Sequence, residues 1–225
     1  MSNSVHTADP HAVAGPGHHH AHHFQSAEHE FQTCKLGMWI FLVQEILFFS
    51  GLFLAYGIFR WMHPEMFFGA HKTLDVTLGA TNTVILIFSS LTMALAVRAA
   101  QLNQRGQSAV LLVITLLCAF GFLVIKYFEY SHKFHLGMLP GRLYFYDGLT
   151  QFRDPHIFFG VYFIMTGLHG IHVIGGIVVI GWILRRTLRG EFSSEYYTPV
   201  EMTGLYWHLV DLIWIYLFPL LYLVG

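Results

Sequence analysis

A few ionisable side chains stand inside long apolar stretches of this sequence. They are Glu45, Lys126, Glu129, His169, His172, His208 and Asp211. In such surroundings a carboxylate or a histidine can carry a proton, two histidines can bind a metal or a haem, and a lysine beside a glutamate can form an ion pair. A charged group at the middle of a membrane span costs roughly 2.5 to 3.5 kcal/mol. Each of these residues therefore needs a partner or a function.

Lys126 and Glu129 are three residues apart near the end of their apolar run. Side chains at this spacing share one face of a helix, and a lysine near a helix end can extend its ammonium group to the lipid headgroups. We therefore predict that Lys126 and Glu129 form a structural ion pair.

His169 and His172 lie in "TGLHGIHVIGG", where Thr166 and Gly176 extend one small and polar helix face. Small residues allow membrane helices to approach closely. Two histidines on one face could bind a metal, but haem ligands on opposite sides of the iron cannot come from one helix at this spacing. Neutral histidines, hydrogen-bonded inside a bundle, are the favoured interpretation.

His208 and Asp211 are also three residues apart, in "YWHLVDLIWIY". At about 1.5 Å per helical residue, Glu45 lies roughly 14 Å from the start of its span, and the other two lie roughly 10 to 14 Å along theirs. Both helices are expected to run in the same direction. The three side chains therefore share a membrane level, and a buried polar cluster of Glu45, His208 and Asp211 is possible.

The elements that must position these residues are membrane-spanning helices. The chain is 55% hydrophobic and only 11% charged, which is unlike a soluble domain. A span needs roughly 20 apolar residues to cross a core of about 30 Å, and the sequence contains five such runs. The expected fold is therefore an all-α bundle of five transmembrane helices, at about 36–59, 76–98, 108–131, 156–184 and 202–224.

Lysine and arginine in the short loops favour one orientation, because positive residues are retained in the cytoplasm. The counts on the two sides are nearly balanced, and the cluster "RRTLR" at 185–189 decides between them. We expect a cytoplasmic N-terminus and a periplasmic C-terminus. We expect no signal peptide, no disulfide or zinc site from Cys34 and Cys118, and no nucleic-acid partner.

Two segments lie outside the pattern of spans and short turns. Residues 1–35 form a polar tail that holds eight of the sixteen histidines before residue 30. Dense histidine can bind copper or zinc, but a flexible, solvated tail is favoured. The connection 132–155 is long for a loop, and loops of such length are usually functional or disordered. It is expected on the outer face, so the transmembrane domain occupies 36–225.

Five segments then match one family in the same order: "EILFFSG" (45–51), "ATNTVILIFSS" (80–90), "FEYSH" (128–132), "GLHGIHVIGG" (167–176) and "YWHLVDLIWIYLF" (206–218). The chain resembles subunit III of the haem-copper terminal oxidases, the cytochrome c and quinol oxidases, over about 36–131 and 156–225. It resembles the five-helix form, since the two helices that precede Glu45 in seven-helix members are absent.

The resemblance implies an accessory subunit of a proton-pumping cytochrome c oxidase in aerobic electron transport, as a multi-pass protein of the bacterial inner membrane. Its main partner would be subunit I, with subunit II and phospholipids also in contact. Haem and copper would belong to those partners, and this chain would bind no cofactor and perform no catalysis. Five residues match the family's buried polar positions, implied to be lipid-associated or to support proton uptake: Glu45, His169, His172, His208 and Asp211.

The sequence departs from the family at Lys126, where a glutamine is common, and the connection 132–155 is longer than usual. Three alternatives remain. The chain could belong to a quinol oxidase, it could be a stand-alone haem carrier with His169 and His208 as opposed ligands, or it could be a proton-coupled transporter that uses Glu45 and Asp211. Such transporters usually contain internal repeats, and the sequence shows none.

Overall fold

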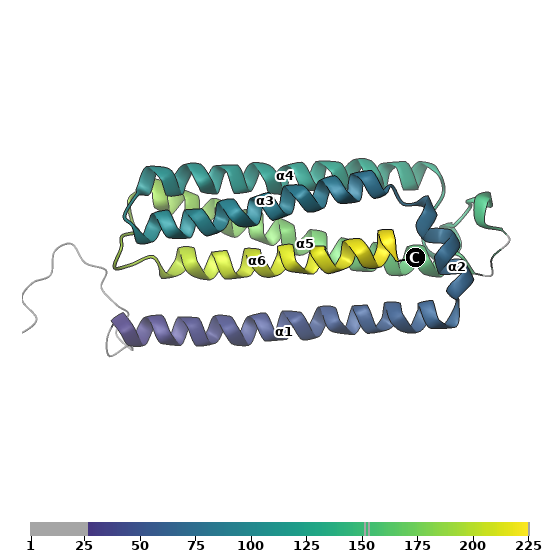
Figure 1. Cartoon of the computed structure of the whole chain (residues 1–225), viewed down its shortest axis with the longest axis horizontal. Helices are drawn as coiled ribbons and strands as arrows, with labels where there is room; N and C mark the ends of the chain where they lie inside the picture. Colours follow the sequence, from purple (N-terminus) through teal and green to yellow (C-terminus); the bar gives the residue numbers. More distant parts are fainter. Residues whose placement is uncertain (1–26, 151, 153, 225) are drawn as a thin grey trace, which may run out of the picture.

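Five long helices run side by side along the molecule, as the computed structural model in Figure 1 shows. The structure describes residues 27–150, 152 and 154–224. The long helices are α1 (Ala27–Met62), α3 (Val76–Gln101), α4 (Arg105–His135), α5 (His156–Leu188) and α6 (Thr198–Phe218). All five are long and apolar enough to cross a membrane. The predicted all-α fold with five spans is confirmed.

The helices extend beyond the predicted runs, because polar residues at their ends continue the helical turns. Helix α1 includes residues from Ala27 onward, which were predicted as tail, and residues 1–26 lie outside the described part. Helix α4 continues to His135. The long connection therefore covers 136–155 and contains the short helical turns η2 (Gly141–Leu143) and η3 (Asp147–Leu149).

Helix ends are set by recognisable local signals. Pro64 begins the short helix α2 (Pro64–Ala70), followed by the turn η1 (His71–Thr73). Asp75 caps α3 by accepting hydrogen bonds from the backbone N–H groups of Thr77 and Leu78 at 2.9 and 3.2 Å, as expected of an N-cap residue. At the other end of α3, Asn103 adopts a φ of 59°. This left-handed turn joins α3 to α4 as a tight hairpin. We refer to the two ends of the bundle as the α2 end and the Asn103 end.

Four helices enclose the core, and α1 lies to one side of them (Figure 1). Helix α3 packs on α4 and α6, and α5 packs on α4 and α6, whereas α1 contacts α5 and α6 less closely. Only 11% of the most apolar window of α1 is buried, compared with 50% in the span that contains α6. Most of the α1 surface therefore faces the surroundings of the chain.

A close helix contact in the core involves Gly176 of α5. A Cβ atom at Gly176 would lie 2.6 Å from the ring of Trp207 on α6, whereas a Cβ atom at Gly170 would meet nothing within 4 Å. Gly176 therefore allows α5 and α6 to pack closely. Gly167 and Gly170 instead line a shallow groove between α4 and α5.

Candidate functional site

Glu45 of α1 is hydrogen-bonded to His172 of α5, with 2.9 Å between Oε2 and Nε2. The other ring nitrogen of His172, Nδ1, lies 2.8 Å from the backbone carbonyl of Leu168, one turn earlier in α5. The Phe49 ring packs edge-on against the imidazole at 5.1 Å. The Glu45 and His172 side chains are 12% and 18% exposed, so the pair lies near the protein surface but is largely covered.

The hydrogen bonds of His172 define where protons can sit. A carbonyl oxygen only accepts, so Nδ1 must carry a hydrogen and donate it to Leu168. The contact between Nε2 and the Glu45 carboxyl then contains one shared proton, either on the imidazole or on the carboxyl group. In both cases the pair is neutral as a unit, which reduces the cost of placing it inside a membrane.

His208 and Asp211 of α6 face α3 rather than α1. The His208 Nδ1 atom lies 2.7 Å from the Ser90 hydroxyl, and Asp211 Oδ2 lies 3.5 Å from the Ser89 hydroxyl. The structure therefore does not bring Glu45 together with His208 and Asp211 as predicted. Another α6 residue does contact this region, since Tyr206 donates a hydrogen bond to the backbone carbonyl of His172 at 2.9 Å. The side chains point in different directions because depth along a helix does not determine its rotation.

Lys126 and Glu129 lie inside the bundle, near the α2 end, with 2.9 Å between Nζ and Oε2. The lysine also donates to the hydroxyl groups of Tyr162 and Tyr222, at 3.2 and 3.0 Å. Lys126 is only 7% exposed, so its ammonium group does not reach toward the headgroups. Its three donors are all used within the protein.

Glu129 receives hydrogen bonds from several neighbouring elements. Its Oε1 atom accepts from Tyr222 at 2.6 Å and from Tyr162 at 2.9 Å, and Lys133 Nζ lies 3.4 Å away. These contacts join α4 to α5 and to the π-helical turn η4 (Pro219–Leu223) after α6. We name Lys126, Glu129, Lys133, Tyr162 and Tyr222 the lysine cluster.

Sequence reasoning found only the two members of the lysine cluster that are close along one helix. Tyr162 and Tyr222 come from other helices, and Lys133 was assigned to the loop. Tyrosines within apolar runs were the available signal, because a buried phenol usually finds a hydrogen-bond partner.

His169 is fully buried between two aromatic rings. Its imidazole lies 5.5 Å from the Phe122 ring and 5.2 Å from the Trp214 ring. Neither ring nitrogen has a hydrogen-bond partner among the described residues. The described residues contain no group of three or more His, Cys, Asp or Glu side chains that could hold a metal ion.

Comparison with known proteins identifies the family of this chain. The model of the cytochrome c oxidase subunit III family matches residues 12–225. Cytochrome c oxidase subunit 3 of Synechocystis sp. is 33% identical over 225 residues, which cover all of this chain and 88% of that protein. Quinol oxidase subunit 3 of Bacillus spizizenii is 30% identical, over 92% of this chain and 97% of that protein. A third relative, haem-copper oxidase subunit I+III of Aeropyrum pernix, is 28% identical, over 84% of this chain and 22% of that protein.

Proposed function

Because the chain belongs to the cytochrome c oxidase subunit III family, we propose that it is the accessory subunit III of a respiratory terminal oxidase and binds directly to subunit I. The observation that carries this proposal is the relative from Aeropyrum pernix. In that protein the segment similar to this chain makes up 22% of a polypeptide named subunit I+III. A fusion of two subunits is most readily tolerated when the two already assemble side by side.

The arrangement of α1 supports a role in assembly. Its exposed apolar side chains face away from the other four helices, and its polar contacts to them are few. The Glu45 carboxyl holds α1 to α5, and the Tyr56 hydroxyl donates to the Leu220 carbonyl at 2.6 Å. We propose that subunit I and phospholipids cover this exposed surface in the complex, and that subunit II completes the assembly.

The proposed location is the bacterial inner membrane, with the N-terminus in the cytoplasm. At the Asn103 end of the bundle, the structure places Arg98 and Arg105 together with Arg185, Arg186 and Arg189 at the end of α5. Positive residues favour the cytoplasmic side of a membrane. The Asn103 end would then be cytoplasmic, and α2 and residues 136–155 would lie in the periplasm.

This chain is proposed to bind no redox cofactor, with haem and copper held by subunits I and II. The interior histidines have other environments: His172 bonds to Glu45, His208 bonds to Ser90, and His169 is enclosed by aromatic rings. We propose that Glu45, His172, His208 and Asp211 help to keep the proton-uptake side of subunit I in its working arrangement. They would do so by fixing the helices rather than by passing protons.

The test is purification of the complex through a tag on this chain, followed by identification of the bands on a gel. Subunits I and II should be recovered in amounts equal to the tagged chain, and recovery of the chain alone would contradict the proposal. Oxygen uptake by the complex with reduced cytochrome c, and separately with ubiquinol, identifies the donor. We propose cytochrome c, on the basis of the 33% identical relative from Synechocystis sp.. The quinol oxidase relative supports ubiquinol as the alternative.

A further inference from the structure

Asn82 of α3 and His169 of α5 are buried polar side chains without hydrogen-bond partners among the residues that the structure describes. Both residues are 0% exposed. The orphaned atoms are the amide oxygen and nitrogen of Asn82 and the two ring nitrogens of His169. Most buried polar groups in proteins are bonded to another protein atom or to ordered water. These four atoms therefore indicate a partner that the described side chains do not provide.

Trp214 of α6 connects the surroundings of the two residues. Its ring nitrogen donates to the Thr83 hydroxyl at 3.1 Å, and Thr83 follows Asn82 directly in α3. The same indole lies 5.2 Å from the His169 imidazole, measured between ring centroids. Asn82 and His169 therefore lie at nearly the same level of the bundle.

Helices α3 and α5 stand at opposite corners of the four-helix core, because each packs mainly on α4 and α6. A fully buried side chain on such a helix points toward the centre of the bundle rather than toward its surroundings. Asn82 shares the buried face of α3 with Leu86 and Ser89. His169 shares that of α5 with Val173. The two orphaned side chains therefore approach the centre from opposite sides.

A water molecule matches the hydrogen-bonding groups of both side chains. A neutral imidazole offers one donor and one acceptor, and an amide offers two donors and an acceptor, whereas water can both donate and accept. Buried waters typically make about three hydrogen bonds to polar groups that would otherwise be unsatisfied. Because both residues are inaccessible from the surface, the ligand must also be small.

We propose that ordered water binds at the centre of the bundle between Asn82 and His169 and bridges the two side chains. The water joins α3 to α5, which the packing of the helices leaves at opposite corners. The inference goes beyond the proposed function, because it concerns the interior of this chain and holds whichever subunits surround it.

Two substitutions remove the polar groups one at a time. Asn82→Leu keeps the number and branching of the side-chain heavy atoms, and His169→Phe keeps a flat ring in place of the imidazole. Each single variant leaves the water and the other side chain with one partner fewer, so each should lower the unfolding temperature. The double variant has neither polar group and no longer needs the water. It should unfold at a higher temperature than either single variant.

The variants are purified through a tag on this chain, in the complex that it forms. Unfolding is followed as the temperature at which the chain becomes sensitive to brief proteolysis. A double variant that unfolds no higher than the less affected single variant would overturn the proposal, because independent sites have additive effects. A single variant that unfolds above the unaltered chain would overturn it as well, since the replaced side chain would then have been unsatisfied in the native protein.

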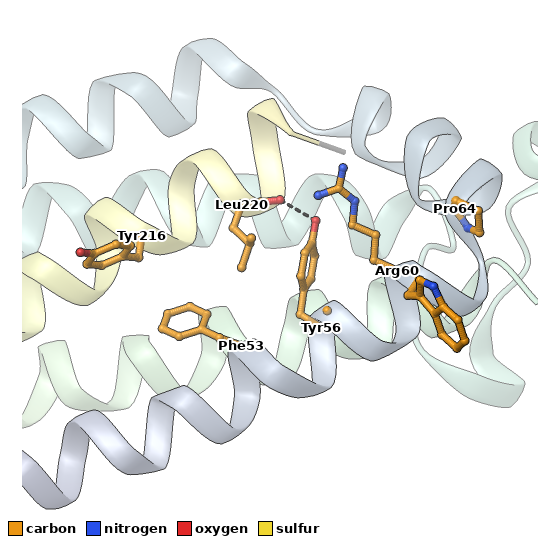
Figure 2. Close-up of a pocket in the computed structure, with 8 residues that line it drawn as sticks. Phe53, Tyr56, Arg60, Pro64, Tyr216 and Leu220 are labelled. Carbon is orange, nitrogen blue, oxygen red and sulfur yellow. Dashed lines mark hydrogen bonds between the residues drawn. The ribbon is translucent and has the colours of Figure 1, made fainter.

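The control is Tyr56→Phe, which removes a buried hydroxyl group at another place in the bundle. Figure 2 shows the hydrogen bond that it deletes, from the Tyr56 hydroxyl to the Leu220 carbonyl at 2.6 Å. The Tyr56 ring packs on Phe67, which differs from the rings that contact His169. Combined with His169→Phe, Tyr56→Phe should lower the unfolding temperature below that of both single variants. A recovery in this pair too would show that the coupling is not specific to the water site, and the proposal would fail.

A cryo-electron microscopy map of the unaltered complex tests the ligand itself and requires no variant. At a resolution that reveals ordered water, a density peak should lie within hydrogen-bond distance of both Asn82 and His169. The absence of such a peak, or a direct hydrogen bond between the two side chains, would contradict the proposal. Recovery of this chain without subunits I and II would instead contradict the proposed function alone, since the proteolysis comparison applies to the chain in either case.

Discussion

Glu45 and His172 are hydrogen-bonded across the contact between α1 and α5, and this geometry predicts how Glu45 responds to substitution. In Glu45→Gln, the amide can donate to Nε2 while Nδ1 still donates to Leu168. We expect the complex to keep most of its initial rate of oxygen consumption. Glu45→Leu leaves Nε2 without its partner, at a cost of about 1 to 3 kcal/mol. We expect less of this chain to remain in the purified complex.

The control for Glu45→Leu is Gln44→Leu, because Gln44 is adjacent and exposed. It should leave the initial rate unchanged and lower the subunit content less than Glu45→Leu does. An amide cannot release and rebind a proton as a carboxyl group can. A complete loss of the initial rate in Glu45→Gln, with the chain still bound, would therefore show that Glu45 carries protons itself and would contradict the structural role.

Lys126 is predicted to tolerate glutamine but not leucine. Removal of one partner from a buried ion pair typically costs about 3 to 5 kcal/mol, and leucine also removes the donor to Tyr162 and Tyr222. Glutamine retains an N–H donor at this position, one bond closer to the backbone than the lysine Nζ atom. We expect Lys126→Leu to lower the thermal unfolding temperature of the complex far more than Lys126→Gln. The exposed Lys72 serves as control, and equal effects of Lys126→Leu and Lys72→Leu would show that the lysine cluster adds no stability.

At the scale of single residues, sequence reasoning succeeded where partners are local. Lys126 and Glu129 share a helix face at three residues' spacing, so their contact follows from helix geometry. Glu45 and His172 are 127 residues apart. The level of Glu45 in the membrane could be estimated from the helix rise. The rotation of α1 about its axis could not, because it depends on which helices α1 packs against, and the sequence alone does not identify them.

At the scale of helices, two glycines of α5 allow a direct comparison between a tightly packed position and an open one. An alanine at Gly176 would press on the Trp207 ring, and overpacking of this kind typically costs about 1 to 3 kcal/mol. An alanine at Gly170 meets open space, and it should be neutral or stabilising by up to about 1 kcal/mol because alanine favours helix. We expect Gly176→Ala to lower the unfolding temperature and Gly170→Ala to leave it unchanged or raise it. The reverse order would contradict the packing of α5 on α6.

The existence of the five spans was predictable because each is a long apolar run, but their ends were not. Helix α4 continues through His132 and Lys133 to His135, since Lys133 is buried against Glu129. Polar residues at the end of a span resemble a loop in the sequence, because the sequence does not show the buried contacts that these residues make. The peripheral position of α1 was also not predictable, because its hydropathy lies within the range of the other four spans.

At the scale of the whole molecule, the described chain is a bundle that places its polar side chains between its own helices and presents apolar helix surfaces outward. Its family places it in a terminal oxidase. The central claim is therefore that this subunit supports the oxygen-reducing subunits without taking part in their chemistry. A supporting subunit should affect how long the enzyme works more than how fast it starts.

The most direct test compares oxygen consumption by the complete complex with that of a complex purified from cells that lack this chain, at equal haem content. We predict similar initial rates, followed by a faster decline over many turnovers in the complex without the chain, and restoration of the lifetime when the chain is supplied again. An initial rate close to zero, in a complex that retains subunits I and II and their haem, would show that this chain is required for the reaction itself and would contradict the account.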